Sequence, residues 1–135
     1  MKPAKIVEVL LELHHRISFE LSDVLKKAEI SLSQYHLLNH MSGKTGINAL
    51  SMTDVSRFCR NSTAAGTGTA DRLEKLGYIE RKYSSEDRRK VLVQLTKKGE
   101  TLLKNCHATV SKLYELDDEF LESLHRLIPD LALAS

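Results

Sequence analysis

Two adjacent arginines, Arg88 and Arg89, lie between two stretches in which polar and apolar residues alternate. The alternation predicts two β-strands, so the polar residues 84–90 between them form the tip of a hairpin. A guanidinium at such a tip can enter the narrow, negatively charged minor groove of a DNA duplex at little steric cost. The sequence therefore predicts a DNA-binding tip, with Arg89 as its first candidate contact.

Positive charge is concentrated around this tip. Residues 57–98 carry 11 Lys or Arg and five Asp or Glu, although the net charge of the whole chain is only +2. Residues 1–56 are balanced and residues 99–135 are acidic. A basic middle segment is typical of a surface that faces a polyanion. The predicted DNA-binding residues are Ser62, Thr63, Thr67, Arg72, Lys82, Arg88, Arg89 and Lys90.

Two histidines have a spacing that suits metal binding. His36 and His40 are four residues apart in a predicted helix, so both imidazoles lie on one face and could hold a metal ion together with His107. The simpler interpretation is a chance pair, because the chain contains six histidines. We favour that interpretation and predict no cofactor.

The two cysteines, Cys59 and Cys106, are too few for a disulfide framework or a four-cysteine metal site. Each could sense oxidants, and the neighbouring Arg60 could lower the pKa of the Cys59 thiol. However, Cys59 follows Phe58 on a predicted apolar helix face, which favours packing over redox chemistry.

Helices are predicted on the N-terminal side of these residues. Apolar residues recur at steps of three and four over residues 4–28, which predicts one long amphipathic helix. Ser31 and Gln34 form a capping-box pattern that begins a second helix, which runs to about Ser42. The first helix is too long to pack within one small domain, so its apolar stripe predicts a partner surface.

A helix-turn-helix spacing follows. Ser51 and Asp54 repeat the capping-box pattern and begin a short third helix. The fourth helix covers about residues 62–76, and Gly77 is suited to a left-handed cap after its end. Such a pair can place its second helix in the major groove of DNA while a following hairpin contacts the backbone or minor groove.

The remaining elements are a hairpin and two helices. Residues 78–83 and 90–95 alternate as strands, and Thr96 can cap a fifth helix. Asp117 can cap a sixth helix, which Pro129 should end or bend. The hairpin with its charged tip is the predicted wing.

Two segments resemble the MarR-type transcriptional regulators. They are DRLEKLGYIER at residues 71–81 and DRRKVLVQLTKKG at residues 87–99, within a similarity that covers about residues 51–104. The resemblance implies a homodimer joined by its first and last helices. It also implies a pseudo-palindromic double-stranded DNA operator, and release of that operator by a small-molecule effector or an oxidant. In the family the wing aspartate positions an arginine, so Asp87 is assigned a supporting role.

The fourth helix departs from the family at residues 64–69, where the sequence AAGTGT replaces larger residues that include an arginine. Gly66 and Gly68 each cost about 1 kcal/mol of helix stability relative to alanine. Two interpretations remain open: the small residues allow a close approach to DNA, or the helix frays and orders on binding. We expect poor base readout, with wing and phosphate contacts dominating the affinity.

The sequence thus predicts a mainly α fold with a small β-hairpin, a winged helix-turn-helix with dimerisation helices at both ends. Residues 1–30 and 99–135 are assigned to dimerisation and residues 31–98 to DNA binding. The predicted function is a dimeric, sequence-specific transcriptional regulator and repressor. The alternative is a winged-helix module for protein interaction or dimerisation in which DNA binding is weak or lost.

The N-terminal residues lack the features of a signal peptide, and no stretch is apolar enough for a membrane helix. We therefore expect a cytoplasmic protein. An enzyme is not predicted, because the sequence has no glycine-rich phosphate loop, no nucleophile elbow and no metal motif of fixed spacing.

Overall fold

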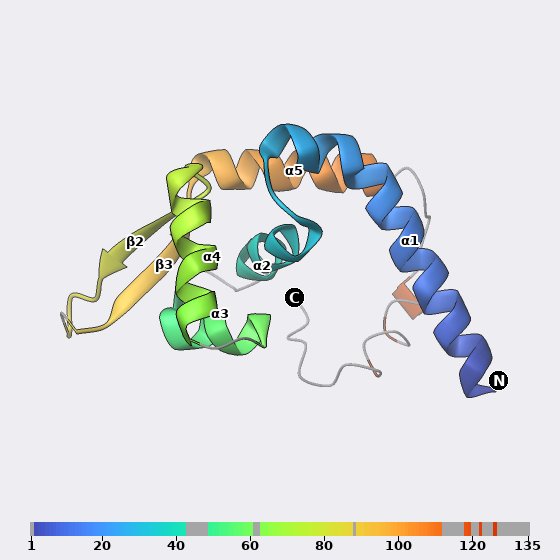
Figure 1. Ribbon diagram of the computed structural model, residues 1–135, viewed down its shortest axis with the longest axis horizontal. Helices are drawn as coiled ribbons and strands as arrows, with labels where there is room; N and C mark the ends of the chain where they lie inside the picture. The colour runs from blue at the N-terminus through green and yellow to red at the C-terminus, as the bar shows by residue number, and fades with distance from the viewer. Residues whose placement is uncertain are drawn as a thin grey trace.

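A computed structural model describes residues 2–42, 49–60, 63–87 and 89–111, together with positions 118, 119, 122 and 126. Helices and a small sheet alternate along this part of the chain (Figure 1). The elements are α1 (Pro3–Ala28), α2 (Leu32–Ser42), β1 (Ala49–Ser51), α3 (Met52–Cys59), α4 (Thr63–Lys75), β2 (Ile79–Tyr83), β3 (Val91–Leu95) and α5 (Lys97–Ser111). The mainly α winged helix-turn-helix is confirmed.

Helices α1 and α2 form as the sequence predicts. The turn after α1 passes through Glu29, whose φ of 62° is left-handed, and the N–H of Ile30 donates to the Leu25 carbonyl at 3.1 Å. At the start of α2, the Gln34 N–H donates to the Ser31 hydroxyl at 3.1 Å and the Ser31 N–H donates to the Gln34 side chain at 2.9 Å. The predicted capping box is confirmed.

The helix-turn-helix pair has the predicted boundaries. A reciprocal capping box joins Ser51 and Asp54 at the start of α3, with donor–acceptor distances of 3.0 and 3.2 Å. Gly77 follows α4 with a φ of +86°, and the N–H of Tyr78 donates to the Leu73 carbonyl at 3.0 Å. Glycine adopts this left-handed conformation without a Cβ penalty, so it ends α4.

The sheet has one strand more than the sequence indicated. Strands β2 and β3 form the predicted antiparallel hairpin, with Ile79 opposite Leu95 and Tyr83 opposite Val91. The short strand β1 also pairs with β3, so the strand order is β1-β3-β2. The two-strand prediction was therefore incomplete.

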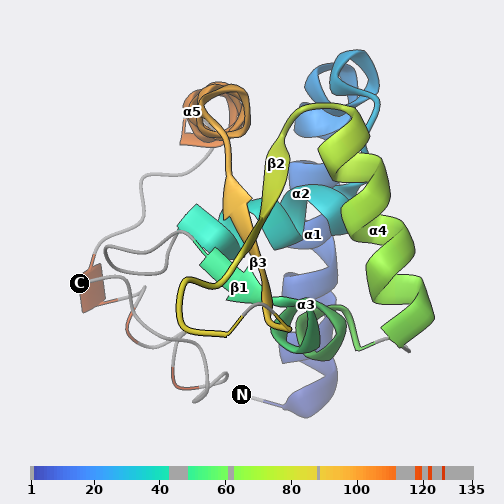
Figure 2. The same ribbon diagram turned by 90° about the vertical axis from the view of Figure 1, so that its left-hand side faces the viewer.

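One core joins the two ends of the described chain. Leu21 of α1, Leu38 of α2, Leu73 of α4, Val93 of β3 and Cys106 of α5 have no accessible surface. The Gly99 N–H donates to the Thr96 hydroxyl at 3.1 Å, which confirms the predicted cap of α5. Figures 1 and 2 show α5 running beside the C-terminal half of α1 above this core. The predicted sixth helix, after Asp117, lies outside the residues that can be assessed as an element.

The N-terminal half of α1 extends away from this core (Figure 1). Two of its apolar side chains, Val7 and Leu11, are 54% and 61% accessible, and Phe19 farther along α1 is 72% accessible. The described helices include none that is long and apolar enough to cross a lipid bilayer.

Candidate nucleic-acid interface

The wing is the β2–β3 hairpin, and its tip is closed by two backbone hydrogen bonds. The N–H of Ser84 donates to the Lys90 carbonyl at 2.9 Å, and the N–H of Lys90 donates to the Asp87 carbonyl at 2.9 Å. Figures 1 and 2 show this hairpin beside α4, so the helix and the wing project together. A large ligand that contacts one of these two elements can therefore also contact the other.

Arg89 is a highly exposed charged side chain at the wing tip. Its side chain is 92% accessible, and Asp87 accepts hydrogen bonds from both its backbone N–H at 3.0 Å and its Nε at 3.3 Å. Asp87 thus orients the solvent-exposed guanidinium of Arg89. The family resemblance implied this contact between the wing aspartate and an arginine. Lys90 is exposed beside it. Arg88 lies outside the described residues.

Lys82 belongs to the β2 strand of the wing. Its side chain is 59% accessible, and its ammonium lies 3.2 Å from a carboxylate oxygen of Glu80 on the same strand. An exposed pair of this kind contributes little to folding and leaves the ammonium able to exchange its partner for a phosphate. Lys82 remains a predicted phosphate contact.

Helix α4 packs into the core through Ala70 and Leu73, which are fully buried. Thr67 is half-buried on this helix. Thr63 is the first residue of α4, but its side chain is not described, and Ser62 is outside the described residues. Their predicted contacts with bases or phosphates stay predictions.

The two helical glycines have different surroundings. Gly66 is buried where α4 crosses α3, and a Cβ atom at this position would lie 3.2 Å from the Cα of Ser56 and closer still to its hydroxyl. Gly68 is exposed, with open space where a Cβ would be. Packing between helices therefore accounts for Gly66, which neither sequence interpretation had considered. The alternative of lost DNA binding rested on the whole run of small residues at 64–69, and it loses Gly66 as part of that support.

Arg72 points toward the end of α1. Its Nη2 donates to the Glu29 carbonyl at 2.7 Å, and the nearby Tyr78 hydroxyl donates to the Ala28 carbonyl at 2.9 Å. These side chains supply partners for carbonyls that a helix C-terminus leaves without intrahelical donors. In this conformation Arg72 joins α4 to the turn between α1 and α2.

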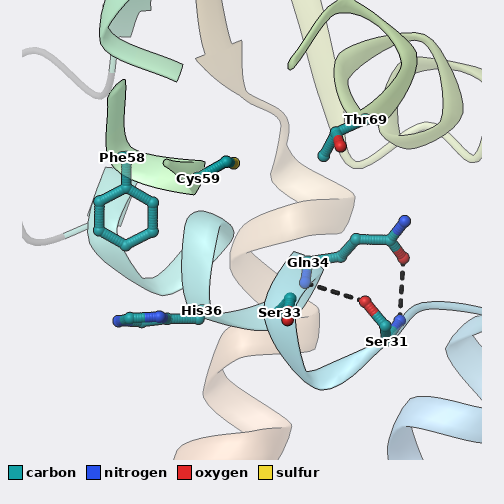
Figure 3. A pocket seen from close by; sticks show the side chains of 7 residues that line it. All are labelled: Ser31, Ser33, Gln34, His36, Phe58, Cys59 and Thr69. Carbon is teal, nitrogen blue, oxygen red and sulfur yellow. Dashed lines mark hydrogen bonds between the residues drawn. The ribbon is translucent and has the colours of Figure 1, made fainter. Parts of the chain in front are cut away.

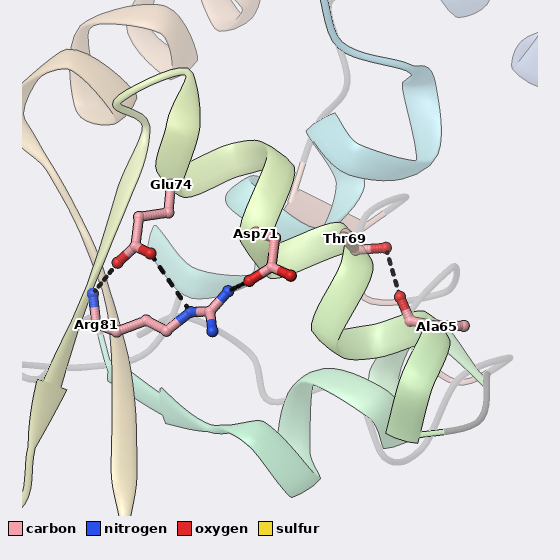
Figure 4. Close-up of polar contacts among 5 residues, drawn as sticks. All are labelled: Ala65, Thr69, Asp71, Glu74 and Arg81. Carbon is pink, nitrogen blue, oxygen red and sulfur yellow. Dashed lines mark hydrogen bonds and ion pairs between the residues drawn. The ribbon is translucent and has the colours of Figure 1, made fainter.

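The sequence analysis did not single out Arg81, which links β2 to α4 (Figure 4). Its guanidinium forms an ion pair with Asp71, and its Nε lies 3.7 Å from a carboxylate oxygen of Glu74. Its backbone N–H also donates to Glu74 at 3.0 Å. The sequence signals were its place at the end of the segment DRLEKLGYIER and an inward-pointing position in an alternating strand, four residues after Gly77.

The histidine pair surrounds an aromatic ring. The ring of Phe58 on α3 stacks on His40 at a centroid distance of 4.2 Å and meets His36 edge-on at 4.7 Å. His107 instead contacts Asn39, with 2.6 Å between Nε2 and the amide oxygen. Among the described residues no three potential ligands gather as a metal site. Burial, with the charge of Arg60, lowers the pKa of His36.

Cys59 borders a cavity of about 370 Å³ between α2, α3 and α4 (Figure 3). Burial raises the pKa of the Cys59 thiol, in the opposite direction to the lowering that Arg60 could have caused, and this agrees with the packing role favoured from the sequence. Cys106 is fully buried, and burial raises its pKa to about 11. Both thiols are therefore mostly protonated near neutral pH, which disfavours nucleophilic chemistry.

Known sequences match most of the chain. The family of transcriptional regulators described as SarA/Rot matches residues 20–106. The HTH-type transcriptional regulator YhbI of Bacillus subtilis is 34% identical over 116 residues, which are 80% of this chain and 71% of YhbI. YfiV of the same organism is 32% identical over 81 residues, or 60% of this chain, and the match spans only 49% of YfiV.

Solved structures share the fold. A mutant MepR from a multidrug-resistant clinical isolate of Staphylococcus aureus has a TM-score of 0.78 at 16% identity, covering 92% of each chain. NadR in complex with 4-hydroxyphenylacetate has a TM-score of 0.73 at 26% identity, covering 98% of this chain and 95% of NadR. Sco3205, a MarR family regulator from Streptomyces coelicolor in complex with DNA, has a TM-score of 0.65 at 20% identity, covering 96% and 84%.

Proposed function

Because the chain belongs to the SarA/Rot family of transcriptional regulators, we propose that it binds a pseudo-palindromic DNA operator as a homodimer and represses transcription there. In this complex α4 lies in the major groove and the wing reaches the adjacent minor groove. Sco3205 is a structural neighbour with DNA bound, which supports DNA as the partner.

The observation that carries this proposal is the wing tip. Arg89 is 92% accessible, and Asp87 directs it from a hairpin that stands beside α4. A guanidinium held at the tip of a narrow hairpin fits the negative potential of a narrow minor groove. Lys82 and Lys90 add exposed positive charge on the same hairpin, where phosphates of the duplex would lie.

The apolar surface of α1 supports the proposed homodimer. Val7, Leu11 and Phe19 are each more than half accessible, and burying them requires a surface that the described part of the chain does not supply. A twofold pair that buries these residues would present two α4 helices to two operator half-sites. We assign this role to residues 1–30 and 99–135, and DNA binding to residues 31–98.

A small-molecule effector is the proposed signal for release. An open cavity of about 560 Å³ lies between α1 and α5, and its lining includes the apolar residues Val24 and Leu102 and the cationic residue Lys98. This arrangement suits an aromatic or aliphatic anion. NadR is a structural neighbour with 4-hydroxyphenylacetate bound, which supports a ligand of that general class.

The test begins with selection of duplexes from random DNA by the purified chain. Affinity for the selected operator is then measured for Arg89→Ala and for Lys104→Ala, which removes an exposed cation from α5. We expect Arg89→Ala to lose about tenfold in affinity or more and Lys104→Ala to bind as the parent does. Failure to select any duplex, or equal binding by both variants, would contradict the proposal.

A further inference from the structure

Arg81 is more shielded from solvent than Lys82 and Arg89 of the described wing. Its side chain is 25% accessible, against 59% for Lys82 and 92% for Arg89. Water therefore screens its ion pairs with α4 less than it screens the exposed pairs of the wing. The Arg81 guanidinium is paired with carboxylates of the protein and is therefore poorly placed to contact a phosphate.

Asp71 and Glu74 lie one helical turn apart, and both carboxylates face β2 (Figure 4). Without a cation between them, they would place two negative charges where α4 and the wing face the phosphates of the proposed complex. Like charges at that position would oppose binding of any duplex. Arg81 offsets this charge from inside the protein.

The contacts of Arg81 also fix where the wing stands relative to the helix. The backbone N–H bond to Glu74 sets the position of β2 along α4, and the guanidinium contact with Asp71 resists rotation of the helix about its axis. A helix in one groove and a wing in the next must fit the duplex at the same time, so a change in their relative placement costs operator contacts.

We propose that Arg81 is a positioning residue for operator recognition. It contacts no DNA, holds α4 and the wing at the separation of adjacent grooves, and neutralises Asp71 and Glu74. This role rests on the proposed function, because it presupposes that the protein binds an operator.

The test compares two double variants that each remove one ion pair without changing the net charge. Asp71→Asn/Arg81→Met removes the shielded pair between α4 and β2. Glu80→Gln/Lys82→Met removes the exposed pair on the same strand and serves as the matched control. Both are titrated at several salt concentrations with the selected operator and with a scrambled duplex of equal length.

For Asp71→Asn/Arg81→Met we expect at least a tenfold loss of operator affinity and less than a threefold change with the scrambled duplex. The dependence of affinity on salt should stay unchanged, because no phosphate contact is lost. For the control pair we expect equal losses on both duplexes, and a salt slope smaller by about 0.9, which one lost phosphate contact gives.

A ratio of operator to scrambled affinity within threefold of the parent would overturn the role of Arg81, and so would equal losses accompanied by a smaller salt slope. If the double variant fails to fold, the single variant Asp71→Asn serves as the test, since Asp71 is 63% accessible and its substitution should be tolerated. We expect this variant to bind scrambled DNA more tightly, and its ratio of operator to scrambled affinity to fall at least threefold. An unchanged ratio would overturn the proposal. Absence of operator binding by the parent would instead refute the proposed function.

Discussion

Alanine substitutions at Gly66 and Gly68 should shift stability in opposite directions, although the two positions are two residues apart on one helix. At Gly68 the added methyl group meets open space, so the gain is the helix propensity of alanine over glycine, about 1 kcal/mol. For a chain of 135 residues this corresponds to a rise of roughly 3–5 °C in the unfolding temperature. The helix is already formed from Thr63, so we expect no gain in operator affinity from ordering.

At Gly66 the same gain is outweighed by overlap with Ser56. The new Cβ would lie 3.2 Å from the Cα of Ser56 and closer to its hydroxyl, so α3 and α4 must separate. Overpacking of this kind costs about 1–3 kcal/mol, which leaves a net loss of up to about 2 kcal/mol for Gly66→Ala. Adding Ser56→Ala should recover part of the loss, because the buried Ser56 hydroxyl has no hydrogen-bond partner among the described residues.

The assay is thermal unfolding followed by circular dichroism, with all variants at one protein concentration because a dimer makes the midpoint concentration-dependent. Equal midpoints for the two single variants, or a more stable Gly66→Ala, would refute the packing argument. A loss of operator affinity in a well-folded Gly68→Ala variant would show instead that DNA approaches the helix closely at that position.

The other predictions concern titration, thiol reactivity and one buried hydroxyl. The pKa of His36 is lowered from 6.5 in the folded chain, so the contribution of the neutral imidazole to stability is complete above pH 6.5 and is lost as the pH falls below it. In the His36→Gln variant, the unfolding free energy from urea titrations should therefore change less between pH 7 and 5 than in the parent. Cys106, with a pKa of about 11 and no accessible surface, should resist iodoacetamide at pH 8 until the protein is unfolded, and labelling of the native protein at the rate of a free thiol would contradict its burial. Tyr78→Phe removes the hydrogen bond to the Ala28 carbonyl and should cost about 1 kcal/mol of unfolding free energy in urea titrations, whereas an unchanged midpoint would mean that water replaces the hydroxyl.

Local signals were sufficient for most of the fold. The capping boxes at Ser31 and Ser51 and the left-handed Gly77 depend on residues within one turn, so the sequence predicted the helix boundaries well. The short strand β1 was missed because three residues cannot display an alternating pattern, and its partner β3 is distant in the sequence.

The sequence was sufficient to predict that Arg89 is exposed at the tip of the wing, because this exposure depends only on the local hairpin. It was not predictable where the role depends on a tertiary neighbour. Arg81 looks like any strand arginine until β2 lies against α4, and Gly66 looks like a weak helix residue until α3 crosses it. The spacing of His36 and His40 predicted a shared face, but only the fold shows that Phe58 occupies it.

The hydrogen bonds from Arg72 and Tyr78 to the last carbonyls of α1 have a mechanical consequence. They attach the C-terminal end of α1 to the helix-turn-helix unit, so a tilt of α1 moves that unit with it. In a twofold pair, a small change in the angle between the two α1 helices would alter the span between the two α4 helices. In the proposed dimer, the spacing of the two operator half-sites would therefore depend on the angle between the two α1 helices.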